Sequence, residues 1–256
     1  MFGHTRQSQI LDYLRKHPSS SVTQLQIKLG VSRSTLRRDL VELEEQGAIV
    51  RVHGGVVHRD SLRGEPTYDR RGREATQAKR RIAAAAAALV PEGCVVYLDA
   101  GTTCAELGRL LAVRKDIRIF THSVRLLIEV GESAASLTCL GGEYRPVSQA
   151  VVGGLALDWL SHLHFDFGFI GASGLDAETG ASTTELSEAA LKQAIVERSD
   201  RVILAADARK WEKPAAVNFA GWQSIHTLVT DEAPARSHRR SLADRDTEVV
   251  VAAIES

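Results

Sequence analysis

The chain has 256 residues, of which 44% are hydrophobic and 25% are charged, and its formal net charge is zero. This length and composition suit a globular protein with one small and one medium domain. No apolar stretch approaches the ~20 residues needed to span a bilayer, which argues against a membrane protein. The polar N-terminus, Met1 to Ile10, lacks the apolar core of a signal peptide, so we expect a cytoplasmic protein with no membrane partner.

The three cysteines, Cys94, Cys104 and Cys139, stand far apart and form no C-x-x-C pair. An odd, dispersed set without neighbouring histidines argues against a disulfide framework and against a zinc site. We therefore expect buried, reduced thiols, with no bound metal and no cofactor.

The zero net charge hides an uneven distribution along the chain. Residues 1–60 hold nine Lys and Arg against six Asp and Glu, a net charge of +3, and residues 61–256 carry the balancing −3. A charge of +3 fits any solvated surface, so the placement of the basic residues decides what they indicate.

Two helices are predicted before residue 30. The first runs from about Arg6 to His17, shows one apolar face and ends at Pro18. Ser21 and Gln24 then stand in the spacing of a capping box, which predicts a second helix from Val22 to Leu29.

A third helix is predicted from Arg33 to Gln46, with Ser32 as its N-cap. Its apolar stripe consists of Leu36, Leu40 and Leu43. Because only Gly30-Val31-Ser32 separates the second and third helices, the pair is predicted to form a helix-turn-helix with the third helix as recognition helix. Two short strands, Ala48–Val52 and Val56–His58, are expected to flank His53-Gly54-Gly55 as a wing.

The outer face of the third helix carries guanidinium and hydroxyl groups, which suit base edges and phosphates in the major groove of double-stranded DNA. The expected DNA contacts are Ser21, Thr23, Ser32, Arg33, Ser34, Thr35, Arg37, Arg38, Arg51, His53, Gly54 and Gly55. Two alternatives remain: a charged helix face that is merely solvated, and a winged helix that docks another protein.

The run LGVSRSTLRRDLVELEEQGAIVRVHGG, Leu29 to Gly55, resembles the N-terminal signature of the DeoR family of bacterial sugar-metabolism regulators. The resemblance covers the whole module, which we assign to residues 1–58. It implies a sequence-specific, nucleoid-associated transcription regulator that represses a sugar-metabolism operon. Because one winged helix makes few DNA contacts, we also expect a homo-oligomer, a dimer or tetramer.

Residues 59–74 are charged, contain Gly and Pro and show no apolar period, so we predict a linker there and a second domain over residues 75–256. An alanine-rich helix is expected over Thr76–Leu89. Seven apolar runs then predict strands at 95–98, 117–120, 137–140, 165–170, 202–206, 227–230 and 249–252, with helices at about 103–113, 123–131, 151–163 and 184–199. This alternation predicts an α/β domain with a mainly parallel sheet covered on both faces.

Ligands of such sheets bind beyond the carboxyl ends of the strands, where this chain places glycines, hydroxyls and charged groups. The first strand leads into Asp99-Ala100-Gly101-Thr102-Thr103 and a helix, which suits an anion although it is not an ATP-binding loop. The expected effector contacts are Asp99, Gly101, Thr102, Thr103, His122, Ser123, Gly141, Gly142, Gly171, Gly174, Glu188, Lys192, Asp207 and Lys210. Taken singly, each also fits a turn, a cap or a surface ion pair.

Three further segments, Lys79–Thr103, Leu140–Gly154 and Phe165–Lys192, resemble the sensor domain of the same family, which is similar in fold to ribose-5-phosphate isomerases. The resemblance implies a phosphorylated sugar as effector, with the Asp99–Thr103 loop holding the phosphate. The departures are His122, where the family usually has asparagine, and Ala208-Arg209, which replace serines.

An enzyme is the alternative: a sugar-phosphate isomerase carrying a DNA-binding module, with Glu185 or Glu188 as the proton-transfer base. The fused helix-turn-helix favours sensing over turnover, so we predict a regulator and no catalytic residue.

Overall fold

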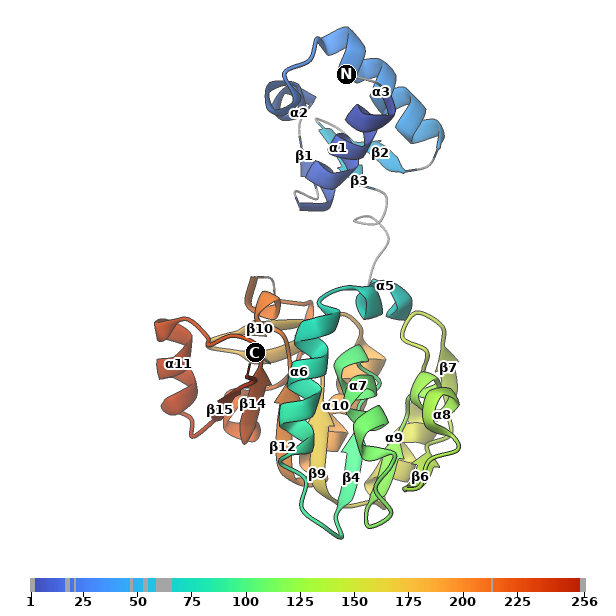
Figure 1. Ribbon diagram of the computed structural model, residues 1–256, viewed down its shortest axis with the longest axis vertical. Coiled ribbons are helices and arrows are strands. Elements are labelled where there is room, and N and C mark those ends of the chain that lie inside the picture. Colours follow the sequence, from blue (N-terminus) through green and yellow to red (C-terminus); the bar gives the residue numbers. More distant parts are fainter. Residues whose placement is uncertain are drawn as a thin grey trace. The chain divides into compact units, whose positions relative to one another are not determined.

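The computed structural model describes residues 3–16, 19–20, 22–46, 48–52, 55–58, 66–212 and 214–253. The chain divides into two compact units, residues 1–66 and residues 67–256, called here the N-terminal and C-terminal units (Figure 1). None of the helices in these described ranges is long and apolar enough to cross a membrane.

The N-terminal unit combines helices with a small antiparallel sheet. Its described elements are α1 (Gly3–Lys16), β1 (Ser19–Ser20), α2 (Val22–Leu29), α3 (Arg33–Glu45), β2 (Ile49–Val52) and β3 (Gly55–His58). Strand β3 lies between β1 and β2 and pairs antiparallel with both. The predicted helix-turn-helix is confirmed, with α2 at the expected bounds and α3 one residue shorter.

Helical spacing explains how this unit packs. Leu36, Leu40 and Leu43 are almost fully buried along one side of α3, as their i, i+4, i+7 pattern predicts. They share one core with α1, α2 and the sheet, made of Ile10, Leu14, Leu25, Ile49 and Val56. The predicted capping residue Ser21 and the wing residues His53 and Gly54 lie outside the described residues.

A seven-stranded parallel sheet forms the centre of the C-terminal unit. Its strands are β4 (Val95–Leu98), β5 (Arg118–Thr121), β6 (Ser136–Cys139), β9 (Phe165–Ile170), β12 (Ser199–Ala205), β14 (Thr227–Thr230) and β15 (Glu248–Val251). They lie in the order β15-β14-β12-β9-β4-β5-β6, and every neighbouring pair is parallel. The predicted mainly parallel sheet is confirmed.

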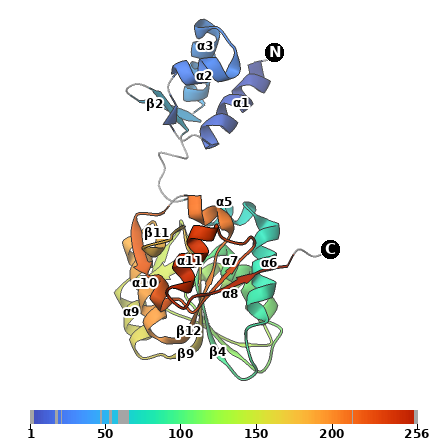
Figure 2. The same cartoon turned by 90° about the vertical axis from the view of Figure 1, so that its left-hand side faces the viewer.

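Helices cover both faces of this sheet. The described helices of this unit are α5 (Tyr68–Arg73), α6 (Thr76–Ala87), α7 (Thr102–Leu111), α8 (Val124–Val130), α9 (Gly154–Ser161), α10 (Leu186–Glu197) and α11 (Arg236–Ala243). Buried side chains of α6, α7 and α8 pack on one face, and those of α9, α10 and α11 on the other (Figures 1 and 2). Strand β12 serves both layers, because Ile203 and Ala205 face one core and Val202 and Leu204 the other.

Short elements that sequence analysis did not predict complete the unit. They are β7 (Glu143–Arg145), β8 (Ala150–Val152), β10 (Gly174–Asp176), β11 (Gly180–Thr183), β13 (Val217–Ala220) and the 3-10 helices η1 (Ala208–Glu212) and η2 (Trp222–Ser224). The helix expected over 151–163 starts only at Gly154, because residues 150–152 form β8 and Gly153 turns the chain with φ of 93°.

The end of the expected linker is also structured. Residues 68–73 form α5, whose N-cap Thr67 accepts a hydrogen bond from the Arg70 N–H at 3.4 Å. The element escapes a search for apolar periodicity because Tyr68 is its one buried side chain among charged neighbours. Helix α5 therefore belongs to the C-terminal unit and is the first element of that unit among the described residues.

Candidate functional site

The N-terminus of α3 is fixed by a local cap. The Ser32 hydroxyl accepts a hydrogen bond from the Thr35 N–H at 3.2 Å, which satisfies a free donor of the first turn. The same oxygen lies 2.8 Å from the Thr35 hydroxyl and 3.0 Å from the Ser34 hydroxyl. These contacts hold three hydroxyls together at the leading end of the recognition helix.

Two contacts with α1 set the rotation of α3. Arg6 donates two hydrogen bonds to the Asp39 carboxylate, from Nε to Oδ2 at 2.5 Å and from Nη2 to Oδ1 at 2.8 Å. The Gln7 amide donates to the Glu42 carboxylate at 2.5 Å. Because α1 holds this side of α3, the opposite side remains available for a partner.

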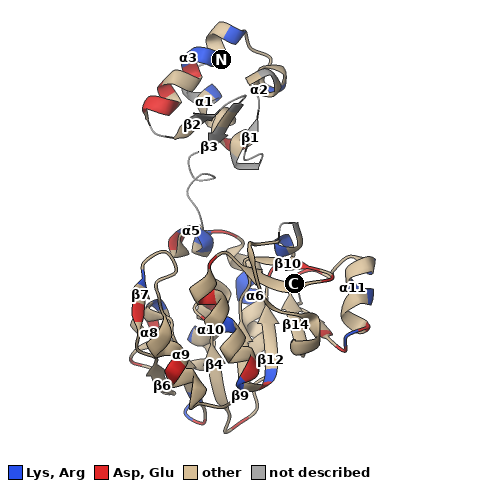
Figure 3. Ribbon diagram, turned by 180° about the vertical axis from the view of Figure 1, so that it is seen from behind, with Lys and Arg blue, Asp and Glu red and all other residues tan. Residues whose placement is uncertain are grey.

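That opposite side is basic. Arg33, Ser34, Arg37 and Arg38 are exposed, and Thr35 is half-buried. Figure 3 shows Lys and Arg colouring near the start of α3 and Asp and Glu colouring toward its end. Of the other predicted DNA contacts, Thr23 lies on α2, Arg51 on β2, and Gly55 begins β3. The arrangement presents hydroxyls and guanidiniums together, which suits phosphates and base edges.

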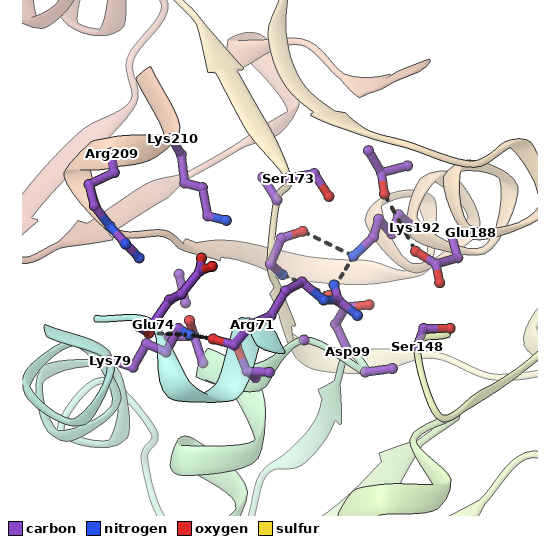
Figure 4. Close-up of a pocket in the computed structure, with 18 residues that line it drawn as sticks. Arg71, Glu74, Lys79, Asp99, Ser148, Ser173, Glu188, Lys192, Arg209 and Lys210 are labelled. Carbon is purple, nitrogen blue, oxygen red and sulfur yellow. Dashed lines mark hydrogen bonds and ion pairs between the residues drawn. The ribbon is translucent and has the colours of Figure 1, made fainter. Parts of the chain in front are cut away.

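A pocket lies at the carboxyl edge of the central strands of the C-terminal unit (Figure 4). The loops after β4, β9 and β12 meet there, and α5, α6 and α10 add side chains. The lining residues are Arg71, Glu74, Lys79, Asp99, Ala100, Gly101, Thr102, Thr103, Ser148, Gly171, Ala172, Ser173, Thr183, Glu188, Lys192, Ala205, Arg209 and Lys210. This position is the one expected for a ligand of a parallel sheet.

An ion pair forms the floor of this pocket. Lys192 Nζ donates to Asp99 Oδ2 at 2.5 Å and to the Gly171 carbonyl at 3.0 Å, and both side chains are buried. The Gly171 N–H donates to the same carboxylate oxygen at 2.9 Å. Burial is the largest single influence and raises the pKa of Asp99, but Lys192, His122 and the Gly171 N–H together outweigh it, so the pKa is lowered overall. Asp99 is therefore an ionised acceptor.

The glycines beside this pair allow close approach of the backbone. A Cβ at Gly101 would lie 3.4 Å from Asp99 Oδ2 and 3.7 Å from the Gly171 Cα. Gly101 is also the N-cap of α7 and makes no side-chain cap, so the first N–H groups of that helix face the loop without a side-chain acceptor from it. This end of α7 favours an anion.

On the α10 side, Glu188 is held by an arginine that sequence analysis missed. Arg145 Nη1 lies 2.8 Å from Glu188 Oε1 and donates to the Ser148 hydroxyl at 3.3 Å. Thr183 Oγ1 donates to Glu188 Oε2 at 3.5 Å. The paired carboxylate thus offers acceptor capacity for hydroxyl groups of a ligand.

Three cationic side chains, Lys79, Arg209 and Lys210, lie across the pocket from Glu188, and a fourth, Arg71, extends toward Asp99 (Figure 4). Arg209 Nε binds Asp207 Oδ1 at 2.9 Å. Burial lowers the pKa of Lys79 to about 8, and burial likewise lowers the pKa of Lys210. Burial thus disfavours the charged form of both lysines. An anionic ligand would stabilise that form, because its negative charge compensates the cost of burying the ammonium groups.

Eight of the predicted effector residues line this pocket. They are Asp99, Gly101, Thr102, Thr103, Gly171, Glu188, Lys192 and Lys210. The structure thus brings together residues that sequence analysis took from the ends of different strands and from one helix.

The other six predicted effector residues do not line the pocket. His122 lies behind Asp99, with Nδ1 2.8 Å from the Tyr97 hydroxyl, and Ser123 caps α8 by accepting from the Leu126 N–H. Asp207 is buried and faces Arg209. The remaining three are glycines.

Those three glycines have structural surroundings. A Cβ added at Gly141 would meet no atom within 4 Å, whereas Gly142 packs directly on β8. Gly174 pairs with Ser182 in the β10–β11 hairpin. Each follows a strand, as predicted, but the chain has already turned away from the pocket.

Three of the lining residues missed by sequence analysis, Arg71, Glu74 and Lys79, come from the segment before the sheet. Arg71 and Glu74 belong to the segment assigned to the linker, and Lys79 lies in the first half of the alanine-rich helix, directly before Arg80 and Arg81. A buried lysine within an alanine-rich apolar face is the signal that could have identified Lys79. Ser148 lies in the turn between β7 and β8, and Thr183 ends the short strand β11; no apolar pattern marks either position.

Both carboxylates proposed for an isomerase are already engaged. Glu185 is the N-cap of α10 and accepts from the N–H groups of Ser187 at 2.8 Å and Glu188 at 3.2 Å. Glu188 is paired with Arg145.

Within the described ranges, no group of three or more His, Cys, Asp or Glu is arranged to hold a metal ion. Of the three cysteines, Cys104 is buried, whereas Cys94 and Cys139 are only partly so, which corrects the expectation for those two.

Known transcription regulators are similar to this chain over almost its whole length. It is 36% identical over 231 residues to the HTH-type transcriptional regulator GlpR of Haloferax volcanii, covering 90% of this chain and 91% of that protein. It is 32% identical to the glycerol-3-phosphate regulon repressor of Escherichia coli K12, covering 93% and 95%. These relatives are regulators and not enzymes.

A solved structure shows a partial likeness. Ribose 5-phosphate isomerase A from Methanocaldococcus jannaschii is 17% identical and aligns with a TM-score of 0.39, covering 53% of this chain and 54% of that one. A likeness of this size carries no conclusion about a reaction.

Two family descriptions match the chain. Residues 6–61 match the DeoR-like helix-turn-helix domain, and residues 74–232 match the DeoR C terminal sensor domain. The two matches correspond to the N-terminal and C-terminal units described above. The chain belongs to the DeoR family of helix-turn-helix transcriptional regulators with a C-terminal sensor domain.

Proposed function

We propose that this regulator represses a sugar-metabolism operon and that a phosphorylated sugar in the C-terminal pocket controls its hold on operator DNA. The observation that carries the proposal is the pocket, which combines the α7 N-terminus and four cationic side chains with paired Asp99 and Glu188. Cations and helix N–H groups suit a phosphate, and held carboxylates suit sugar hydroxyls. A relative named as the glycerol-3-phosphate regulon repressor supports this class of effector.

The proposed roles follow the two sides of the pocket. Gly101, Thr102 and Thr103 would contact the phosphate through their N–H and hydroxyl groups, with Lys210 supplying charge. Asp99, Glu188 and Lys192 would contact the sugar. The DNA contacts are proposed on the exposed side of α3, at Arg33, Ser34, Arg37 and Arg38, with Thr35 beside them.

A thermal-shift screen of sugar phosphates against the matching neutral sugars tests this function. A ligand that binds the folded protein at 100 times its Kd stabilises it by about 2.7 kcal/mol. We expect at least one phosphorylated sugar to raise the unfolding temperature, with no shift from its neutral counterpart. Equal shifts from both forms would remove the phosphate from the proposal.

Replacing Arg37 with alanine should weaken binding to the operator by about 1–3 kcal/mol and relax the sequence preference at one position. The operator can be selected from random duplexes, and affinity measured by fluorescence anisotropy at fixed salt. Arg118→Ala removes the same charge from the exposed first residue of β5 and is expected to leave operator affinity unchanged. Equal losses in both variants would mean that Arg37 contributes only general charge.

Anion affinity should fall as pH rises from 7 to 9. With its pKa lowered to about 8, Lys79 is mostly charged at pH 7 and mostly neutral at pH 9. The charged groups that act on Lys79 are Asp207, Lys210, Arg209 and Glu74. Loss of one pocket charge should weaken binding of sulfate, an analogue that does not titrate here, by roughly threefold to tenfold at constant ionic strength. Calorimetry should show this fall in the wild type and a smaller fall in Lys79→Met, where Lys210 is the remaining pocket lysine with a lowered pKa.

The regulator is proposed to act as a homo-oligomer, a dimer or tetramer. One α3 reaches one half-site, so strong specific binding requires two copies on half-sites about 10.5 bp apart or a multiple of that distance. Light scattering at micromolar concentration should give at least twice the chain's 27.8 kDa, with or without operator. A monomer in both conditions would contradict the proposal.

A further inference from the structure

Glu74 stands out in the pocket as an acidic side chain among cations. It lines the same cavity as Arg71, Lys79, Arg209 and Lys210. Figure 4 shows its side chain extending toward Arg209 and Lys210, in the space between these cations and Lys79. A carboxylate in this position supplies the negative charge that the cations would otherwise lack.

The hold on this carboxylate is weak. It forms an ion pair with Arg70 Nε of the same helix at 3.4 Å, and 46% of the Glu74 side chain is exposed. Asp99 and Glu188, by contrast, are buried and bound at 2.5 Å and 2.8 Å. Of the three acidic side chains in the pocket, Glu74 is therefore the one that a competing anion displaces most easily.

The backbone at Glu74 forms a sharp junction between two helices. Glu74 ends α5 in an extended conformation, and the next residue, Ala75, precedes α6 with φ of 48° and ψ of 40°. This left-handed conformation is unfavourable for a residue with a Cβ and persists only where surrounding contacts enforce it. The strain is located where α5 joins the rest of the unit.

The Lys79 side chain makes the contacts that hold this junction between α5 and α6. Its ammonium donates to the Glu74 carbonyl at 2.7 Å and to the Arg71 carbonyl, so it holds the last turn of α5 against α6. At its other end, α5 is fixed by the Tyr68 N–H, which donates to the Val147 carbonyl at 2.8 Å. The same lysine therefore lines the anion pocket and holds the element that leads back to the DNA-binding unit.

We propose that Glu74 is a tethered competitor for the effector's anionic group, and that its displacement by that group alters the α5–α6 junction. This inference rests on the proposed function, which places a phosphate in the pocket. The phosphate and the Glu74 carboxylate carry like charge and compete for the same cations, so both cannot occupy the site. Since α5 is the first described element after the DNA-binding unit, effector binding acts at the C-terminal end of the predicted linker.

The test is a calorimetric titration of inorganic phosphate into the full-length chain at fixed pH and salt. Glu74→Gln keeps the size of the side chain and removes the competing charge, so its phosphate Kd should be lower by about fivefold or more. Asp69→Asn removes an equal charge from the exposed first turn of α5, outside this pocket, and should bind phosphate like the wild type.

A second readout follows the junction itself. Saturating phosphate should change amide hydrogen exchange at residues 70–76 of the wild type and leave it unchanged in Glu74→Gln, where no carboxylate has to move. The wild-type half of this measurement stands without any variant. No change in exchange at 70–76 when phosphate saturates the wild type would overturn the inference.

The possible outcomes distinguish a failure of the role proposed for Glu74 from a failure of the proposed anion site. Equal phosphate affinity in the wild type and Glu74→Gln would overturn the role of Glu74 and leave the anion site standing. An equal gain in Asp69→Asn would assign the effect to general charge and also overturn that role. If neither protein binds phosphate, the proposed anion site is wrong and the inference fails with it.

Discussion

Lys192→Met is expected to lower the free energy of unfolding by about 3–5 kcal/mol at pH 7, because it leaves the Asp99 carboxylate buried without its cation. The remaining partners of Asp99 are the Gly171 N–H at 2.9 Å and His122 Nε2 at 3.6 Å from the carboxylate. Burial lowers the pKa of His122, which therefore supplies little charge at neutral pH. Urea denaturation of the variant and of Lys115→Met, an exposed lysine, measures the difference.

The pH dependence of this loss gives its cause. In the wild type the pKa of Asp99 is lowered, so its contribution to stability is present above the pKa of the unfolded chain and is lost as pH falls. Without Lys192, burial alone raises that pKa, and the carboxyl protonates more readily in the folded variant. The deficit should therefore narrow as pH falls from 7 toward 4. Adding Asp99→Asn to Lys192→Met should recover part of the lost stability. A loss of stability that stays constant with pH and is not recovered in the double variant would contradict the Asp99–Lys192 pairing.

Gly101→Val is expected to abolish the response to phosphorylated sugar while operator binding is retained. Gly101 has φ of −68° and ψ of 150°, which valine adopts without strain, so the effect is one of space. Its Cβ would lie 3.4 Å from Asp99 Oδ2, and the added methyl groups would block approach to the first turn of α7. A loss of about 100-fold or more in effector affinity is expected when a phosphate loses these N–H donors.

Gly141→Val is the matched control for this substitution. Gly141 was predicted to contact the effector, but it does not line the pocket and has open space around a built Cβ. Its response to phosphorylated sugar should equal that of the wild type. If Gly141→Val loses the response and Gly101→Val keeps it, the effector binds elsewhere in the sensor domain.

The helix-turn-helix could be predicted almost completely from sequence, because its signals are local. Ser32 caps α3 through a residue three positions away, and the spacing of Leu36, Leu40 and Leu43 defines the buried side. The contacts that set the rotation of α3 could not be predicted, since Arg6 and Asp39 are brought together only by packing.

The pocket could be predicted in part. The rule that ligands bind at strand ends located Asp99 and Gly171, which directly follow β4 and β9, and Gly101, two residues after Asp99. The same rule also selected His122 and Asp207, because position after a strand does not determine whether a side chain points into the pocket or behind it. Arg71 and Glu74 were missed because α5 shows no apolar period and is held by Lys79 through main-chain carbonyls.

The most direct test of the account is a titration of selected operator DNA at fixed salt, with no ligand, with a phosphorylated sugar and with the matching neutral sugar. An effector shifts operator affinity only if it binds the DNA-competent and DNA-incompetent states differently. We predict that a phosphorylated sugar raises the operator Kd of the wild type by about tenfold or more, that the neutral sugar leaves it unchanged, and that Gly101→Val responds to neither. Equal effects of both sugars on the wild type, or a full response in Gly101→Val, would contradict sensing of phosphate by this pocket.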